Sequence, residues 1–144
     1  MRIPTKTNIQ VSSNLKALDR VLLQFNKVYQ EYITQKDWLQ CQLALVEGFT
    51  NAVRHAHKDL PSETPIFIEV SLTREQMEIR IWDQGKYFDL SSFIATMSQE
   101  NEQWLGSGRG IAIMAKIADR LEYNRLSCDR NCLLIVKKFQ KNRA

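Results

Sequence analysis

The sequence has little of what marks membrane, secreted or fibrous proteins. Its 144 residues include 5 glycines and 3 prolines, with no internal repeat and no low-complexity segment, which excludes a collagen-like or disordered chain. No run approaches the roughly 20 apolar residues of a membrane-spanning helix, and the first residues lack the apolar core of a signal peptide. These absences predict a cytoplasmic protein that does not act at a membrane.

Cysteine and histidine are also scarce, and neither forms a metal motif. Cys41, Cys128 and Cys132 are odd in number, and none belongs to a Cys-x-x-Cys pair. The two histidines, His55 and His57, are two positions apart on a predicted helix, so they point in different directions and make a poor metal pair. We therefore interpret the cysteines as free thiols and His57 as a surface residue.

What the chain does have is the balance of a globular domain. Hydrophobic residues make up 44% of it and charged residues 25%, close to the averages for soluble proteins. The length suits a single core, so we expect one domain over residues 1–144. The net charge of +4 owes much to basic residues near the end, which are Lys137, Lys138, Lys141 and Arg143. Because no aromatic RNA-binding strand accompanies them, we expect no direct contact with nucleic acid.

Apolar periodicity divides the chain into helices and hairpins. Helical spacing predicts helices over residues 15–28 and 37–58 and a third that begins near Gly110. Strict alternation predicts an edge strand over residues 5–11 and two hairpins, made of strands 66–72 with 77–83 and 121–126 with 132–139. Residues 85–107 have weak periodicity, which predicts a long functional loop with about one helical turn.

This order of elements favours one fold class. Helices in pairs and antiparallel hairpins, without strict alternation of strand and helix, are typical of an open sheet covered on one side. The expected architecture is an α/β fold, a two-layer sandwich with a mixed, mostly antiparallel sheet and helices packed on one face.

The helix predicted over residues 37–58 has a polar side suited to a nucleotide. Glu47 and Asn51 are four positions apart and therefore neighbours, which places a carboxylate beside an amide oxygen. An amide oxygen together with substrate phosphates suits Mg²⁺, and the carboxylate can deprotonate a hydroxyl. The alternative is that both residues are ordinary solvated surface.

Asp83 ends a predicted strand on the same face as Met77, Ile79 and Ile81. That face is expected to meet the helices, where a carboxylate needs a partner. Gly85 permits a tight turn and the close approach of a ligand, so Asp83 can accept a hydrogen bond from an adenine amino group. In the alternative interpretation, backbone amides satisfy Asp83 at a turn that ends the strand.

A glycine-rich segment, Gly106-Ser107-Gly108-Arg109-Gly110, leads into the third predicted helix. Glycines let backbone amides approach phosphate oxygens, and a helix N-terminus adds positive potential. Arg109 can contact a terminal phosphate as a bidentate donor. The alternative interpretation is a flexible loop.

The order and spacing of these segments resemble a known superfamily. Residues 47–56 are similar to the N box, Asp83-Gln84-Gly85 to the first glycine box and residues 106–110 to the second, of the ATPase superfamily shared by gyrase and histidine kinases. Within it, Asp83-x-Gly85-x-x-Phe88-Asp89, and Gly108-Arg109-Gly110-Ile111 followed by Asp119 and Tyr123, resemble the anti-sigma factor serine kinases of bacterial partner switching. The resemblance covers residues 8–139.

This resemblance implies a Bergerat-type sandwich that binds ATP and Mg²⁺, with residues 86–107 as a lid. It implies Asn51 on the metal, Asp83 on adenine and Glu47 as the catalytic base, with Arg109 stabilising the transferred phosphate. The cofactor-binding residues that it implies are Asn51, His55, Asp83, Gly85, Gly106, Ser107, Gly108, Arg109, Gly110 and Ile111.

The function implied by the resemblance is a serine/threonine protein kinase that phosphorylates an anti-anti-sigma (STAS) protein and sequesters a sigma factor or another target, as a homodimer. A histidine kinase would need a phospho-accepting histidine on a separate dimerisation helix, and the sequence shows none. One alternative is a nucleotide-gated binding module with little or no kinase activity, which the presence of Glu47 disfavours. Another is a salt-sensitive nucleic-acid binder that uses the basic end.

Overall fold

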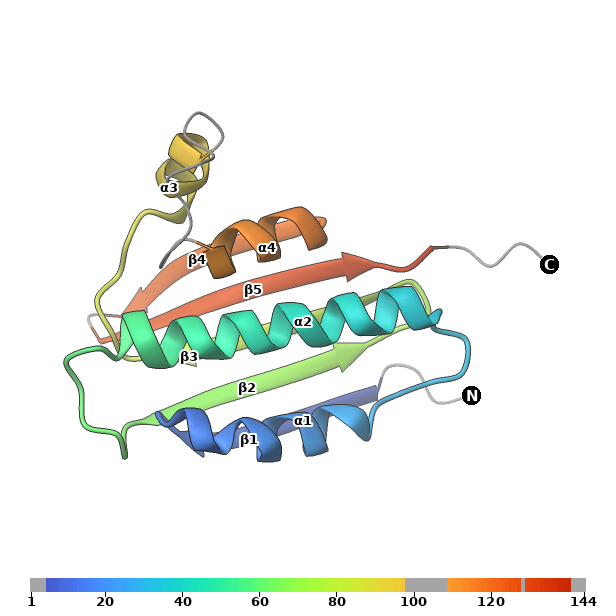
Figure 1. Ribbon diagram of the computed structural model, residues 1–144, viewed down its shortest axis with the longest axis horizontal. Helices are drawn as coiled ribbons and strands as arrows, with labels where there is room; N and C mark the ends of the chain where they lie inside the picture. The colour runs from blue at the N-terminus through green and yellow to red at the C-terminus, as the bar shows by residue number, and fades with distance from the viewer. Residues whose placement is uncertain (1–4, 98–108, 128, 141–144) are drawn as a thin grey trace.

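A five-stranded sheet forms one layer of the molecule (Figure 1). The computed structural model describes residues 5–97, 109–127 and 129–140. The strand order is β1-β2-β3-β5-β4, and every pairing is antiparallel. The strands are β1 (Thr5–Ser12), β2 (Pro65–Leu72), β3 (Gln76–Asp83), β4 (Arg120–Ser127) and β5 (Arg130–Lys138). The predicted edge strand and both predicted hairpins are confirmed.

The sheet has one apolar face because buried and partly exposed side chains alternate along its strands. On β2 and β3, two of the three inner strands, every second side chain is buried, namely Ile66, Ile68, Val70, Leu72, Met77, Ile79, Ile81 and Asp83. The register places Ile68 opposite Ile81, so the buried rows of the two strands continue across the sheet. Asp83 therefore lies on the helix-facing side, as its strand parity predicts.

The helices form the second layer. Figure 1 shows α1, α2 and α4 on the same face of the sheet. The helical elements are η1 (Leu15–Ala17), α1 (Leu18–Asn26), α2 (Gln35–Asn51), its continuation η2 (Ala52–Ala56), α3 (Leu90–Met97) and α4 (Arg109–Ile117). The expected two-layer α/β sandwich is confirmed. Within the described ranges, no helix is long and apolar enough to cross a membrane.

Helix α3 lies in the segment that weak periodicity predicted to be mainly a loop. It has 8 residues, about two helical turns. Asp89 caps it, because Oδ1 accepts from the Ser92 backbone N–H at 3.1 Å and Oδ2 accepts from the Ser92 hydroxyl at 3.0 Å. The cap explains why serines that favour loops can start a helix here.

The second predicted helix ends in a π-helical turn. After Asn51 the chain continues as η2, and the His57 N–H donates to the Ala52 carbonyl, five residues back, at 2.8 Å. An α-helix would use the carbonyl four residues back. The wider turn changes the direction of every side chain that follows it, and apolar spacing does not reveal such a turn.

The start of α2 is fixed by a cap and by a buried carboxylate. Thr34 Oγ1 accepts from the Asp37 N–H at 3.1 Å and acts as the N-cap. Asp37 is fully buried, and its Oδ2 accepts from the Gln140 backbone N–H at 2.9 Å. The carboxylate also interacts favourably with the helix dipole. The segment after β5 is thereby tied to the first turn of α2.

We expect Asp37→Ala to lower the free energy of unfolding by about 1–3 kcal/mol, because the Gln140 N–H loses its charged acceptor. Asp37→Asn keeps an acceptor oxygen and should lose less. Urea unfolding measures both. The control is Asp59→Ala, at an exposed position, which should stay within about 0.5 kcal/mol of wild type. If Asp37→Ala were as stable as this control, the carboxylate would not anchor the helix.

Candidate functional site

Glu47, on α2, meets the first turn of α4. Helices α2 and α4 pack against each other, and a Cβ on Gly110 would lie 2.7 Å from Glu47 Oε1. The carboxylate therefore occupies room that a glycine leaves free. The first N–H groups of a helix have no partners within it and carry positive potential. The structure thus brings two predicted segments together at a place suited to negative charge.

The other residues predicted near the phosphates differ in exposure. Asn51 ends α2 and is half-buried, while Arg109 begins α4 and is exposed. His55 is exposed on η2. The Ile111 side chain is 4% exposed and belongs to the hydrophobic core, so any contact of this residue with a nucleotide would be made by its backbone. The predicted residues Gly106, Ser107 and Gly108 lie outside the described residues.

Asp83 is buried and already holds three protein donors. Its Oδ1 accepts from the Gly85 N–H at 2.9 Å and from Asn131 Nδ2 at 2.8 Å. Its Oδ2 accepts from the Tyr123 hydroxyl at 2.8 Å. Each carboxylate oxygen has two lone pairs, so Oδ2 retains one acceptor position. Protein groups thus hold the side chain in one orientation, and among the described residues no further donor uses the second lone pair of Oδ2.

Tyr123 belongs to an aromatic cluster above Asp83. Burial, together with the negative charge of Asp83, raises the pKa of Tyr123 above its usual value, so the hydroxyl stays protonated and donates. The Tyr87 ring stacks on the Tyr123 ring with centroids 5.5 Å apart, and the Phe88 ring lies 5.0 Å from it. The residues after Gly85 are therefore packed onto β4 near the carboxylate.

The turn after β3 presses against the end of η2 at Gly85. A Cβ on Gly85 would overlap the carbonyl of Ala56. Because the obstacle is backbone, no side-chain rotation can relieve it. The sequence predicted that Gly85 allows close approach of a ligand; the structure shows that the close approach is made by the protein's own helix end.

His57 is buried, so its interpretation as a surface residue is wrong. Its side chain is 2% exposed, and Nε2 accepts from the Gln84 backbone N–H at 2.8 Å. Burial lowers the pKa of His57 below its usual value of 6.5, although the charge of Asp83 acts in the opposite direction. The π-helical turn explains the error, because it redirects the side chain that follows Ala56.

Sequence reasoning missed the role of Asn131, although a signal was present. Asn131 is fully buried and donates through Nδ2 to both Asp83 and the Gly85 carbonyl, at 2.8 and 2.9 Å. It shares strand parity with Leu133 and Ile135, which are buried. A polar residue on the buried face of a strand is the same signal that identified Asp83, and the two face each other in the β3–β5 register.

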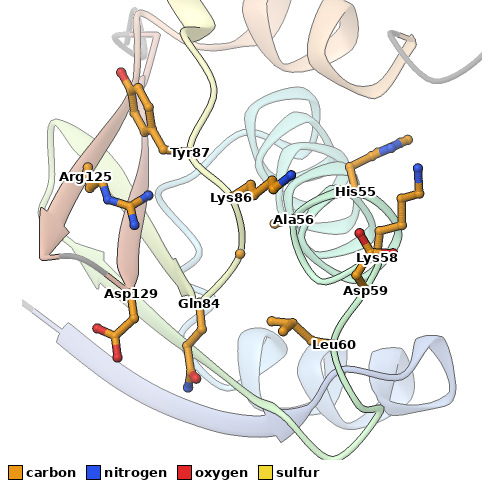
Figure 2. A pocket seen from close by; sticks show the side chains of 11 residues that line it. His55, Ala56, Lys58, Asp59, Leu60, Gln84, Lys86, Tyr87, Arg125 and Asp129 are labelled. Carbon is orange, nitrogen blue, oxygen red and sulfur yellow. The ribbon is translucent and has the colours of Figure 1, made fainter.

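A cavity of about 770 Å³ opens beside this turn (Figure 2). It is lined by two predicted residues, His55 and Gly85, and by the segments around them. Figure 2 shows His55 and Lys58 on one side and Tyr87 and Arg125 on the other. Glu47, Asn51 and Asp83 are not among its lining residues, so the cavity lies beside the Gln84–Gly85 turn that follows Asp83.

The comparisons with known proteins agree with this arrangement. A profile of the histidine kinase-like ATPase domain matches residues 11–137. The fold is similar to the crystal structure of the RsbU and RsbW domains of Rv1364c from Mycobacterium tuberculosis, with a TM-score of 0.67 and 14% identity. This likeness covers 96% of the chain but 33% of the other, so the chain spans about a third of that structure. No curated protein sequence matches.

The fold and the family match together define an ATP-binding class of domain. The chain belongs to the histidine kinase-like ATPase domain family, because the family profile matches nearly its whole length. Membership of this family implies that the chain binds ATP. At 14% identity, the structural likeness concerns the fold.

Alanine at the two close glycine contacts should have different effects on stability. Gly85→Ala sets a Cβ against the Ala56 backbone and should lower the free energy of unfolding by about 1–3 kcal/mol. Gly110→Ala meets only the tip of the Glu47 side chain, which can turn away, and should stay within about 1 kcal/mol of wild type. Urea unfolding of both variants tests this, and equal losses would contradict the assigned contacts.

Proposed function

We propose that the chain is a Mg-ATP-dependent serine/threonine protein kinase of the anti-sigma factor type. It phosphorylates an anti-anti-sigma (STAS) protein and sequesters a sigma factor or another target, acting in the cytoplasm as a homodimer. The observation that carries the proposal is the Glu47 carboxylate against the first turn of α4, one helical turn from Asn51. Family membership and the motif resemblance to anti-sigma factor kinases support it.

The residues at the site fit a magnesium nucleotide. Asn51 offers an amide oxygen of the kind that Mg²⁺ takes beside phosphate oxygens and waters. The first N–H groups of α4, with Arg109, can hold phosphate oxygens. At the other end, Asp83 Oδ2 keeps one lone pair for a donor such as the adenine amino group. Residues 86–107 form the proposed lid over the nucleotide.

In this proposal Glu47 acts as the catalytic base. Bound Mg-ATP supplies the phosphoryl group and the positive charge of the metal. Glu47 is half-buried; in the proposed reaction the hydroxyl of a partner protein approaches its carboxylate, which then holds the proton that the hydroxyl loses. Arg109 and the N–H groups of α4 stabilise negative charge on the phosphate oxygens. Positioning and charge stabilisation of this kind supply most of the catalysis of phosphoryl transfer.

Substitution of the proposed metal ligand Asn51 and of the proposed catalytic base Glu47 should cause different functional defects. Asn51→Ala should weaken Mg-dependent ATP binding by about 10–100-fold, the loss expected when a contact to a charged group is removed. Glu47→Gln should bind ATP as wild type does and lower the rate of phosphate transfer by about 10²–10⁴-fold. Calorimetry with Mg-ATP measures the first, and transfer of labelled phosphate to STAS proteins measures the second.

The control is Asn8→Ala, at an exposed position on β1, which should change neither quantity. A wild-type chain that binds no ATP would refute the proposed function. ATP binding without phosphate transfer to any STAS protein would instead favour the nucleotide-gated binding module.

A further inference from the structure

The turn that presents Asp83 is held at three backbone groups, one on Gln84 and two on Gly85. The Gln84 N–H donates to His57 Nε2 at 2.8 Å, and the Gly85 N–H donates to Asp83 Oδ1 at 2.9 Å. The Gly85 carbonyl accepts from Asn131 Nδ2 at 2.9 Å. Two of these three contacts come from distant segments, one from the end of η2 and one from β5. The turn is therefore clamped from both sides.

His57 is the member of this clamp whose hydrogen bonding changes when it gains a proton as the pH falls below neutrality. To accept from Gln84 at Nε2, the imidazole must be neutral and carry its proton on Nδ1. Nδ1 is buried and, within the described ranges, has no hydrogen-bond partner. A protonated imidazole has N–H groups on both nitrogens, so Nε2 can no longer accept. Protonation would set two N–H donors against each other and open the clamp.

The surroundings of His57 favour the neutral form at physiological pH. Burial, the larger effect, lowers the pKa of His57, and the negative charge of Asp83 on β3 raises it. Charged residues nearby on its own segment and across the cavity are exposed to solvent, which screens them; these are His55, Lys58, Asp59, Lys86, Arg125 and Asp129. The clamp is therefore closed at neutral pH and opens as the pH falls.

We propose that His57 is a positioning residue for nucleotide binding, whose neutral imidazole fixes the turn that orients Asp83, so that protonation of His57 weakens ATP binding. The inference rests on the proposed nucleotide site. The hydrogen bond from Asn131 Nδ2 to Asp83 Oδ1 does not involve the imidazole, so the proposed effect arises from His57.

Two substitutions separate the hydrogen bond from the space that the ring fills. In His57→Gln, the side-chain oxygen can reach the place of Nε2 and accept from Gln84, but it does not titrate. In His57→Leu, the side chain fills space and accepts nothing. At pH 8, wild type and His57→Gln should bind Mg-ATP equally, and His57→Leu about 5–10-fold more weakly, as expected for the loss of one hydrogen bond.

The pH dependence is measured as a ratio. From pH 8 to pH 5.5, the Kd of wild type divided by that of His57→Gln should rise from about 1 toward the 5–10-fold of the leucine variant. ATP's own titration cancels, because both proteins meet the same ligand. A ratio that stays constant across this range would overturn the proposal. The comparison of wild type with His57→Gln still tests the proposal if His57→Leu fails to fold. Thermal unfolding at pH 8 shows whether that variant folds.

A second readout does not need ATP. Hydrogen exchange at the Gln84 amide, followed by NMR, should be slow in wild type and His57→Gln at neutral pH and faster in His57→Leu. At pH 5.5, wild type should exchange faster than His57→Gln. Equal protection in all three would overturn the clamp. A working clamp in a chain that binds no ATP would instead refute the proposed function and leave the role of His57 in the turn.

Discussion

The site depends on how closely the end of η2 approaches the turn after β3. At Gly85 the backbone of the turn lies against the Ala56 carbonyl, in space that any side chain would fill. This contact brings His57 within hydrogen-bonding distance of Gln84. It also fixes where Asp83 stands relative to the residues of α2. A displacement at this one contact would shift the Asp83 end of the site away from the Glu47 end.

Asp83 shows how a buried carboxylate can be both fixed and available. An unpaired carboxylate at 3% exposure would be costly, and donors from Gly85, Asn131 and Tyr123 remove that cost. They use three of its four lone pairs. The remaining lone pair of Oδ2 can accept one more hydrogen bond, which suits the proposed contact with the amino group of adenine.

Local patterns predicted the strands, the three main helices and the side of the sheet on which Asp83 lies, because alternation and helical spacing are set by nearby residues. The burial of His57 could not be predicted, since it follows from a π-helical turn that depends on packing of Ala56 against Gly85. The contact of Glu47 with α4 likewise requires the assembled fold. Asn131 is an intermediate case, because the sequence showed its place on the buried face of a strand but not its hydrogen-bond partners.

The two ends of the site differ in burial, and this difference bears on the proposed reaction. Asp83, Asn131, Tyr123 and His57 are each 5% exposed or less, and hydrogen bonds hold them in place. Glu47 and Asn51 are half-buried, and Arg109 is exposed. An adenine ring is recognised by its shape and its hydrogen bonds, so a rigid, buried end of the site suits it. A kinase must leave its other end open, because the hydroxyl of a second protein has to reach Glu47.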